Sequence, residues 1–209
     1  MKLNIVYEDS EILVVYKPSN VLSISTDKEK EKTIYHLCSQ HLKRKDKSSK
    51  VFIVHRLDKS TSGLMVLAKN YKVKLLLQEA FEKGEVKRFY VARTHNHLPL
   101  DNMRIEMNLV IDKLKVYAVK KPIKSSKKAI TLIRKLASYE DGDLVDIEIL
   151  TGRKHQIRLA LASINCPIIG DPIYSNDREK YMFLKAYKLD ISSLNPKWLF
   201  EISKQFKDK

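Results

Sequence analysis

The chain has 209 residues, 44% hydrophobic and 31% charged, which is the composition of an ordinary folded domain. Its 40 Lys and Arg exceed 25 Asp and Glu, giving a formal net charge of +15, so we expect a polyanionic partner, with nucleic acid ahead of an acidic membrane surface. Two cysteines make no disulfide framework, and no apolar run approaches the roughly 18 residues of a membrane span. We therefore exclude secreted disulfide-rich and integral membrane proteins and expect a cytoplasmic protein.

The first half of the chain alternates strand-like and helix-like segments. Apolar, β-branched runs at 4–7 and 12–16 flank a turn-like sequence and predict an opening β-hairpin. Residues 33–42 and 70–83 are predicted to be helical, and the polar, basic stretch 43–50 predicts a loop. Further strands are predicted at 51–54, 64–68 and 89–92.

Short alternating runs dominate the second half. They predict strands at 103–109, 115–119, 129–134 and 144–150, and a later one at 182–189. Nine basic residues and no acidic one lie from Lys113 to Lys135. Residues 153–164 have helical spacing, and Pro167 helps to end that helix. The pattern predicts an α+β fold, rich in antiparallel strands, in a single domain over 1–209.

The first candidate motif spans residues 54–64, where a strand-like run leads through His55, Arg56 and Asp58 into a turn of small residues. An Asp at the edge of a core stays ionised beside an Arg, because the positive charge favours the carboxylate. Such a carboxylate can act as a nucleophile or as a base. A turn-capping Asp with a structural Arg explains the same pattern, so the motif alone leaves both interpretations open.

The second candidate motif spans residues 150–158, with Thr151 or Gly152 as the expected N-cap of the predicted helix. Near the first turn of that helix, three basic or polar side chains would fan out: Arg153, Gln156 and either His155 or Arg158. Free N–H groups and the helix dipole favour phosphate there. The start of a plain basic amphipathic helix fits the same residues.

The third motif, residues 87–93, interleaves basic residues with Phe89 and Tyr90. This pattern fits base stacking and phosphate contact, and it fits a plain edge strand equally well. A metal site built from His55, Asp58 and His155 is a weaker interpretation, because the sequence contains no HExxH or CxxC motif. Glycine-rich phosphate loops are also absent from the sequence.

Taken together and in this order, the motifs resemble those of the RluA-type pseudouridine synthases, which isomerise uridine to pseudouridine in ribosomal or transfer RNA. The resemblance runs over nearly the whole chain. It is carried by the Lys-Pro at 17–18, the His-Arg-Leu-Asp run at 55–58 with Thr61-Ser62-Gly63-Leu64, the tyrosine at 90, Lys128-Ala129-x-Thr131, Thr151-Gly152-Arg153-x-His155-Gln156-Ile157-Arg158 and the segment 167–174.

The resemblance implies a mixed, mostly antiparallel central sheet with flanking helices and a central cleft. Asp58 would be the catalytic nucleophile, attacking either the uracil ring or the anomeric carbon of the ribose. Arg158 would pair with Asp58 and keep it ionised, and Tyr90 would stack on the target base. Because reactant and product are isomers, the resemblance calls for no ATP, redox cofactor or metal.

The resemblance also implies RNA as the partner, with no membrane and no obligatory protein partner. Arg56 would fill the gap left by a flipped uridine. The other expected RNA-binding residues are Lys17, Arg153, His155, Gln156, Lys120, Lys121, Lys127 and Lys128. The lysines of the basic stretch 113–135 fit a solvated hairpin facing away from the RNA as well.

Two departures from the family pattern stand out. Ala160 occupies a position where the family often has His, which concerns RNA contact, and the catalytic motifs are not preceded by an accessory RNA-binding domain. Two other functions compete with the isomerase: an inactive RNA-binding protein of the same fold, and a metal-dependent RNA hydrolase.

Overall fold

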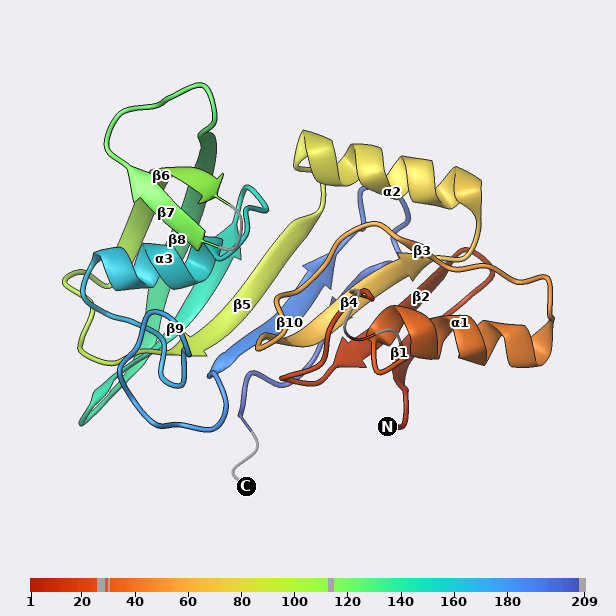
Figure 1. Cartoon of the computed structure of the whole chain (residues 1–209), viewed down its shortest axis with the longest axis horizontal. Helices are drawn as coiled ribbons and strands as arrows, with labels where there is room; N and C mark the ends of the chain where they lie inside the picture. The colour runs from red at the N-terminus through yellow and green to blue at the C-terminus, as the bar shows by residue number, and fades with distance from the viewer. Residues whose placement is uncertain (26–28, 30, 113–114, 207–209) are drawn as a thin grey trace. The chain divides into compact units, whose positions relative to one another are not determined.

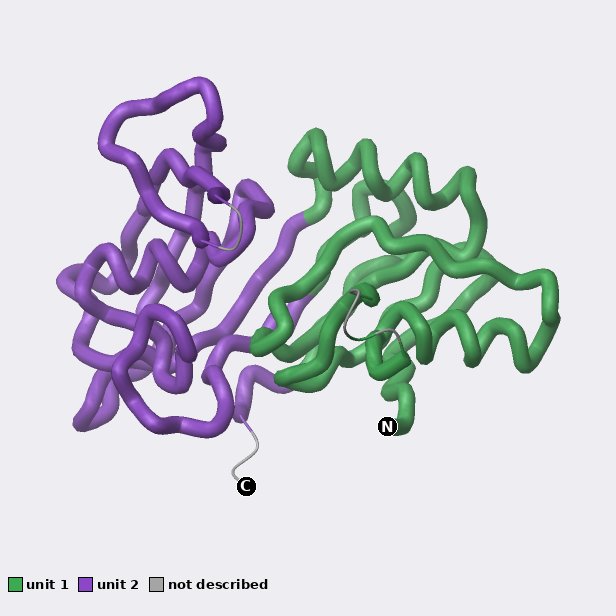
Figure 2. The backbone as a smooth tube through the Cα atoms, in the orientation of Figure 1, with its two compact units in different colours: residues 1–86, 189–202 green, residues 87–188, 203–209 purple. Residues whose placement is uncertain are grey.

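The computed structural model describes residues 1–25, 29, 31–112 and 115–206 (Figure 1). Contacts between Cα atoms divide the chain into two compact units, coloured separately in Figure 2. Unit 1 comprises Met1–Val86 and Leu189–Ile202, and unit 2 comprises Lys87–Lys188 and Ser203–Lys209. The sequence predicts one catalytic domain, and this stays a prediction. Each unit is described by itself.

Unit 1 contains antiparallel strands with a helix on each face. The strands are β1 (Asn4–Glu8), β2 (Ile12–Lys17), β3 (Phe52–Ile53) and β4 (Ser62–Ala68), and the helices are α1 (Ile34–Lys45) and α2 (Tyr71–Lys83). β2 pairs with β1 and β4, and β3 pairs with β4 (Figure 1). Every residue of β4 is buried, which is the pattern of a strand covered on both faces.

The alternation of side chains along β2 explains how both faces are covered. Ile12 and Val14 pack in a cluster with Leu77 of α2, whereas Leu13 and Val15 pack in a cluster with Cys38 of α1. The C-terminal segment, with β11 (Leu199–Glu201), belongs to the first cluster through Trp198 and Phe200.

Unit 2 contains a second series of antiparallel strands and one helix. In order of pairing the strands are β5 (Lys87–Arg93), β9 (Gly142–Ile149), β8 (Lys127–Tyr139), β6 (Asn102–Asp112) and β7 (Lys115–Val119). The helix α3 (Gln156–Ser163) packs on one face, where Leu159 contacts the cluster of Leu109, Val116 and Ala129. Strand β10 (Leu184–Asp190) runs from unit 2 into unit 1.

The structure confirms the α+β fold with mostly antiparallel strands, and all the registers given above are antiparallel. The predicted helix 70–83 is confirmed, because Asn70 caps its start through the Val73 N–H and Gly84 ends it at φ 75°. The predicted central cleft stays a prediction. Within the described part of the chain, no helix has both the length and the apolar character needed to cross a bilayer.

Two predictions about elements are wrong in detail, and one strand was not predicted. Helix α1 extends to Lys45, so the loop predicted at 43–50 begins later; three basic residues occupy the last turn, where the helix dipole favours them. Helix α3 begins at Gln156, and its N-cap is His155 at φ 55°, so neither Thr151 nor Gly152 caps it. Strand β11 has three residues and was not predicted.

Candidate active site

The predicted site residues lie in both units. Unit 1 carries Lys17, Arg56 and Asp58, and unit 2 carries Tyr90, Arg153, His155, Gln156, Arg158 and the predicted lysines. Lys113, the first residue of the predicted basic stretch, lies outside the described residues.

The loop between β3 and β4 carries Asp58, and its backbone is fixed on both sides of this residue. On one side, Leu57 is buried, its N–H donates to Ser23 Oγ at 3.1 Å, and Ser23 Oγ donates to the Leu57 carbonyl at 2.8 Å. On the other side, the Thr61 N–H donates to the Asp58 carbonyl at 3.1 Å and closes a turn. Asp58 is half-buried and Arg56 is exposed, so a loop whose backbone is hydrogen-bonded on both sides of Asp58 carries both side chains.

Lys17, at the end of β2, also anchors this loop. Its side chain is fully buried, and its amine donates to the carbonyls of Pro18 at 2.9 Å, Val21 at 2.7 Å and Lys59 at 3.0 Å. Burial lowers the pKa of Lys17 to about 7, against the opposing effect of the negative charge of Asp58. This position does not support the predicted phosphate contact, because the three N–H groups of the ammonium are already donated to carbonyls inside the protein.

His55 is bound into the core of unit 1. Its Nε2 accepts the Val66 N–H at 3.0 Å, which places the ring proton of the neutral imidazole on Nδ1. The ring also stacks on Phe81 with centroids 4.8 Å apart. Among the described residues, no three His, Cys, Asp or Glu side chains cluster in a way that could hold a metal ion.

Tyr90 lies on β5 in unit 2, and its side chain is on the face of the strands that α3 covers. The register pairs Tyr90 with Ile147 and Ile147 with Ile133, while Arg88 is level with Ile149 and Thr131. Because directly paired residues share a face, Arg88 and Tyr90 lie on the same side as Thr131, which Gln156 of α3 contacts. Tyr90 is 7% exposed.

Gln156 joins two of the sequence motifs through four hydrogen bonds. Its Oε1 accepts from the Thr151 hydroxyl at 2.8 Å and from the Arg153 N–H at 3.0 Å. Its Nε2 donates to the Ile130 carbonyl at 2.9 Å and to Thr131 Oγ1 at 3.1 Å. The side chain is buried and its amide is saturated. We therefore assign Gln156 to holding the 151–155 loop and not to RNA contact.

Gly152 leaves room in that loop for a close approach of the Arg88 guanidinium. A Cβ atom at position 152 would lie 2.5 Å from Arg88 Nη1. Burial, together with the neighbouring charge of Arg153, lowers the pKa of Arg88. The sequence analysis did not single out Arg88, although its place two residues before Tyr90 in the basic and aromatic run 87–93 was a signal that could have identified it.

Arg158 lies in α3 and pairs with a residue that the sequence analysis did not assign. Arg158 Nε is 2.7 Å from Asp171 Oδ2, and Arg158 Nη2 is 2.6 Å from Asp171 Oδ1. Both side chains are buried. His155 Nδ1 lies 2.9 Å from the Tyr174 hydroxyl, so the segments 155–158 and 171–174 interlock. The expected pairing of Arg158 with Asp58 stays a prediction.

Exposed lysines gather around the connection from β7 to β8. Lys120, Lys121, Lys127 and Lys128 are all exposed. Lys128 Nζ is 2.6 Å from Glu106 Oε2 on β6, and adjacent residues of a strand point to opposite faces, so Lys127 and Lys128 project to different sides. Arg153 is also exposed, and its Nε donates to the Lys128 carbonyl at 3.1 Å.

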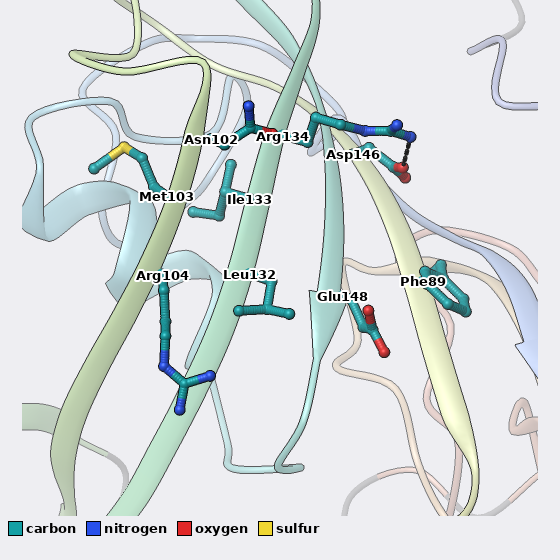
Figure 3. Close-up of a pocket in the computed structure, with 9 residues that line it drawn as sticks. All are labelled: Phe89, Asn102, Met103, Arg104, Leu132, Ile133, Arg134, Asp146 and Glu148. Atoms are coloured by element: carbon teal, nitrogen blue, oxygen red, sulfur yellow. Dashed lines mark hydrogen bonds and ion pairs between the residues drawn. The ribbon is translucent and has the colours of Figure 1, made fainter.

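A separate hollow of about 520 Å³ lies over β5, β6, β8 and β9 (Figure 3). Phe89 and Glu148 line it, and they alternate with Tyr90 and Ile147, so most of the hollow faces away from α3. Two of the lining residues form an ion pair, in which Arg134 Nη2 donates to Asp146 Oδ2 at 2.8 Å. The predicted site residues do not line this hollow.

Comparison with known proteins gives one consistent result. Residues 11–163 match the sequence profile of a family described as RNA pseudouridylate synthase. An uncharacterized RNA pseudouridine synthase of Mycoplasma pneumoniae is 32% identical over 99% of this chain and 69% of its own length. The dual-specificity RNA pseudouridine synthase RluA of Vibrio parahaemolyticus is 32% identical over 95% of this chain and 81% of its own.

Other relatives are longer. Ribosomal large subunit pseudouridine synthase D of Neisseria meningitidis is 35% identical over 85% of this chain, which spans about half of that protein, 47%. Among solved structures, human RNA Pseudouridylate Synthase Domain Containing 4 superposes with a TM-score of 0.81 at 23% identity, covering 96% of this chain and 88% of the human one. This likeness concerns the fold.

Proposed function

The chain belongs to the RNA pseudouridylate synthase family, and from this premise we propose that it isomerises specific uridines of ribosomal or transfer RNA with Asp58 as the nucleophile. The observation that carries the assignment of Asp58 is its place on a loop fixed from both sides. Ser23 holds Leu57, and Lys17 holds the carbonyl of Lys59. A nucleophile is effective when its backbone is positioned before the substrate arrives.

The chemistry replaces the bond from N1 to C1′ by a bond from C5 to C1′ and moves one proton. The bond between N1 of uracil and C1′ of ribose is cleaved, the detached base rotates, and C5 bonds to C1′. The C5 proton then leaves to solvent and N1 gains a proton, so atoms and electrons balance without a co-reactant. Attack of Asp58 on the ring and attack on C1′ both lead through the detached base.

The remaining residues supply orientation and charge. We assign to Arg158 the role of cationic partner of Asp58, and to Tyr90 stacking on the target base. Arg56 is exposed, as a residue that fills the gap of a flipped nucleotide has to be. The proposed phosphate contacts are Arg153, His155, Lys120, Lys121, Lys127 and Lys128. We place this activity in the cytoplasm.

The experiment that tests the proposal is Asp58→Asn in a tritium-release assay, with 5-tritiated total RNA from cells that lack this protein. We expect isomerisation to be abolished and RNA binding to be kept, because the amide retains the shape of the carboxylate but cannot act as a nucleophile. Glu79→Gln on the exposed face of α2 is the matched charge control. Residual turnover within about tenfold of wild type, near 1.4 kcal/mol in barrier, would contradict the role of Asp58.

The same assay addresses the inactive RNA-binding protein of the same fold. Wild-type protein that binds the tritiated RNA and releases no tritium would favour that alternative. Mapping pseudouridines in total RNA from cells with and without the protein then identifies the target uridine.

A further inference from the structure

The pair of Arg158 and Asp171 has the geometry of a clamp. The carboxylate meets the guanidinium side-on and bidentately, through Nε at 2.7 Å and Nη2 at 2.6 Å. Exposure is 3% for the Arg158 side chain and 0% for that of Asp171. A two-point contact of this kind fixes the rotation of the guanidinium plane as well as its position, so the edge that carries Nη1 is directed away from Asp171.

Asp171 is itself held by the segment that follows it. Its Oδ1 also accepts the N–H groups of Ile173 at 2.8 Å and Tyr174 at 3.1 Å. The Tyr174 ring lies beside the Arg158 guanidinium, with Cζ 5.1 Å from the ring centroid, and the Tyr174 hydroxyl lies 2.9 Å from His155 Nδ1. The guanidinium is thus gripped on one edge by a carboxylate and flanked by an aromatic ring.

We infer that Asp171 is a positioning residue for the isomerisation: it fixes the orientation of Arg158 and, through Arg158, the orientation of Asp58. The inference rests on the proposed function, in which Arg158 is the partner of Asp58. A single Arg side chain rotates about several bonds, and a bidentate clamp removes this freedom before substrate binds.

The test is Asp171→Asn, assayed in the full chain with an excess of enzyme over 5-tritiated total RNA. We expect the rate at saturating enzyme to fall by about tenfold or more per folded molecule, while the enzyme concentration for half-maximal rate stays within about threefold. A merely structural role for Asp171 would lower the amount of folded protein and leave the rate per folded molecule unchanged.

Asp143→Asn is the matched control. Asp143 is also a fully buried carboxylate of unit 2, and it accepts from the Leu98 N–H at 2.7 Å and from the Ser138 hydroxyl at 2.7 Å, but it has no part in the Arg158 clamp. This variant should lose stability and keep its rate per folded molecule. Equal rates per folded molecule for the two variants would overturn the inference.

Asp171→Glu covers the case in which Asp171→Asn does not fold. The longer side chain keeps the charge and displaces the clamp, so we expect a lower rate per folded molecule; a wild-type rate would overturn the inference. In an Arg158→Lys background, Asp171→Asn should add little further loss, because Asp171 acts through Arg158. Full additivity would contradict that route. Activity in Asp58→Asn would contradict the proposed function, whereas a wild-type rate in Asp171→Asn would contradict only the role of Asp171.

Discussion

In unit 1 the buried amine of Lys17 anchors the loop that carries Asp58, whereas in unit 2 the buried amide of Gln156 anchors the loop 151–155. Lys17 donates three hydrogen bonds to backbone carbonyls, one of them that of Lys59 beside the nucleophile. Gln156 donates two and accepts two, and so ties the Thr151 hydroxyl and the Arg153 N–H to β8. In each loop, one buried side chain gathers several partners.

The difference concerns what each anchor can satisfy. An ammonium only donates, so it serves a loop that turns its carbonyls inward, whereas an amide both donates and accepts, so it links a strand to a loop that offers N–H and hydroxyl groups. Replacing either anchor leaves its partners unsatisfied inside the protein, which costs more than the loss of an exposed hydrogen bond. We expect the loss of stability to increase with the number of buried groups that a substitution leaves without a hydrogen-bond partner.

Lys17→Met should have the largest effect. The apolar chain fills similar space but leaves three carbonyls without their donor, and at about 1 kcal/mol or more for each, the free energy of unfolding should fall by about 3 kcal/mol or more. Thermal unfolding of the full chain measures the loss. Lys72→Met, at an exposed position of α2, is the control and should be close to neutral. An unchanged melting temperature in Lys17→Met would show that Lys17 does not anchor the loop.

Gln156→Glu should have a smaller effect that depends on pH. The change is isosteric, but the new oxygen faces the Ile130 carbonyl, which now accepts from Nε2 at 2.9 Å, so we expect a loss of about 2 kcal/mol at neutral or alkaline pH. Burial raises the pKa of the new carboxyl in the folded state above its unfolded value. Its protonated form can donate to Ile130, so the loss should be smaller at about pH 5 than at about pH 8.

Urea unfolding at the two pH values measures that difference. Gln40→Glu, at an exposed position of α1, is the control and should show little dependence on pH. A Gln156→Glu loss of equal size at both pH values would mean that the amide does not donate to Ile130.

Neutralising Lys120, Lys121, Lys127 and Lys128 to Gln together should leave stability unchanged and affect only RNA binding. The slope of log K against log salt should flatten by roughly two to three units, because each phosphate contact on a single strand contributes about 0.7. Turnover at saturating RNA should survive, since phosphate contacts position the RNA. Filter binding of total RNA over a salt series measures the slope.

A matched variant tests the basic residues of unit 1 in the same way. It replaces four basic residues of the 43–50 region by Gln: Lys43, Arg44, Lys47 and Lys50. If this variant flattens the slope and the unit 2 variant does not, the basic charge acts from unit 1, and the hairpin lysines are a solvated surface.

Patterns local in sequence were readable without a structure. The apolar, β-branched run at 12–16 predicted a strand of the opening hairpin, and Asn70 and Gly84 bound the helix predicted at 70–83. The family motifs pointed to Asp58 and Tyr90 as well. Helix α3 was placed too early, because spacing of apolar residues cannot show that Thr151 bonds to Gln156 instead of capping the helix.

The sequence by itself determined the α+β class, most of the elements and the family, because hydrophobic periodicity and motif order are properties of neighbouring residues. Only the tertiary structure decided which polar residues are anchors. Lys17 and Gln156 look like RNA contacts in a basic chain, and Asp171 carries no signal beyond its motif, yet each is buried against partners distant in sequence. Burial and long-range pairing depend on how the strands come together, which no local pattern records.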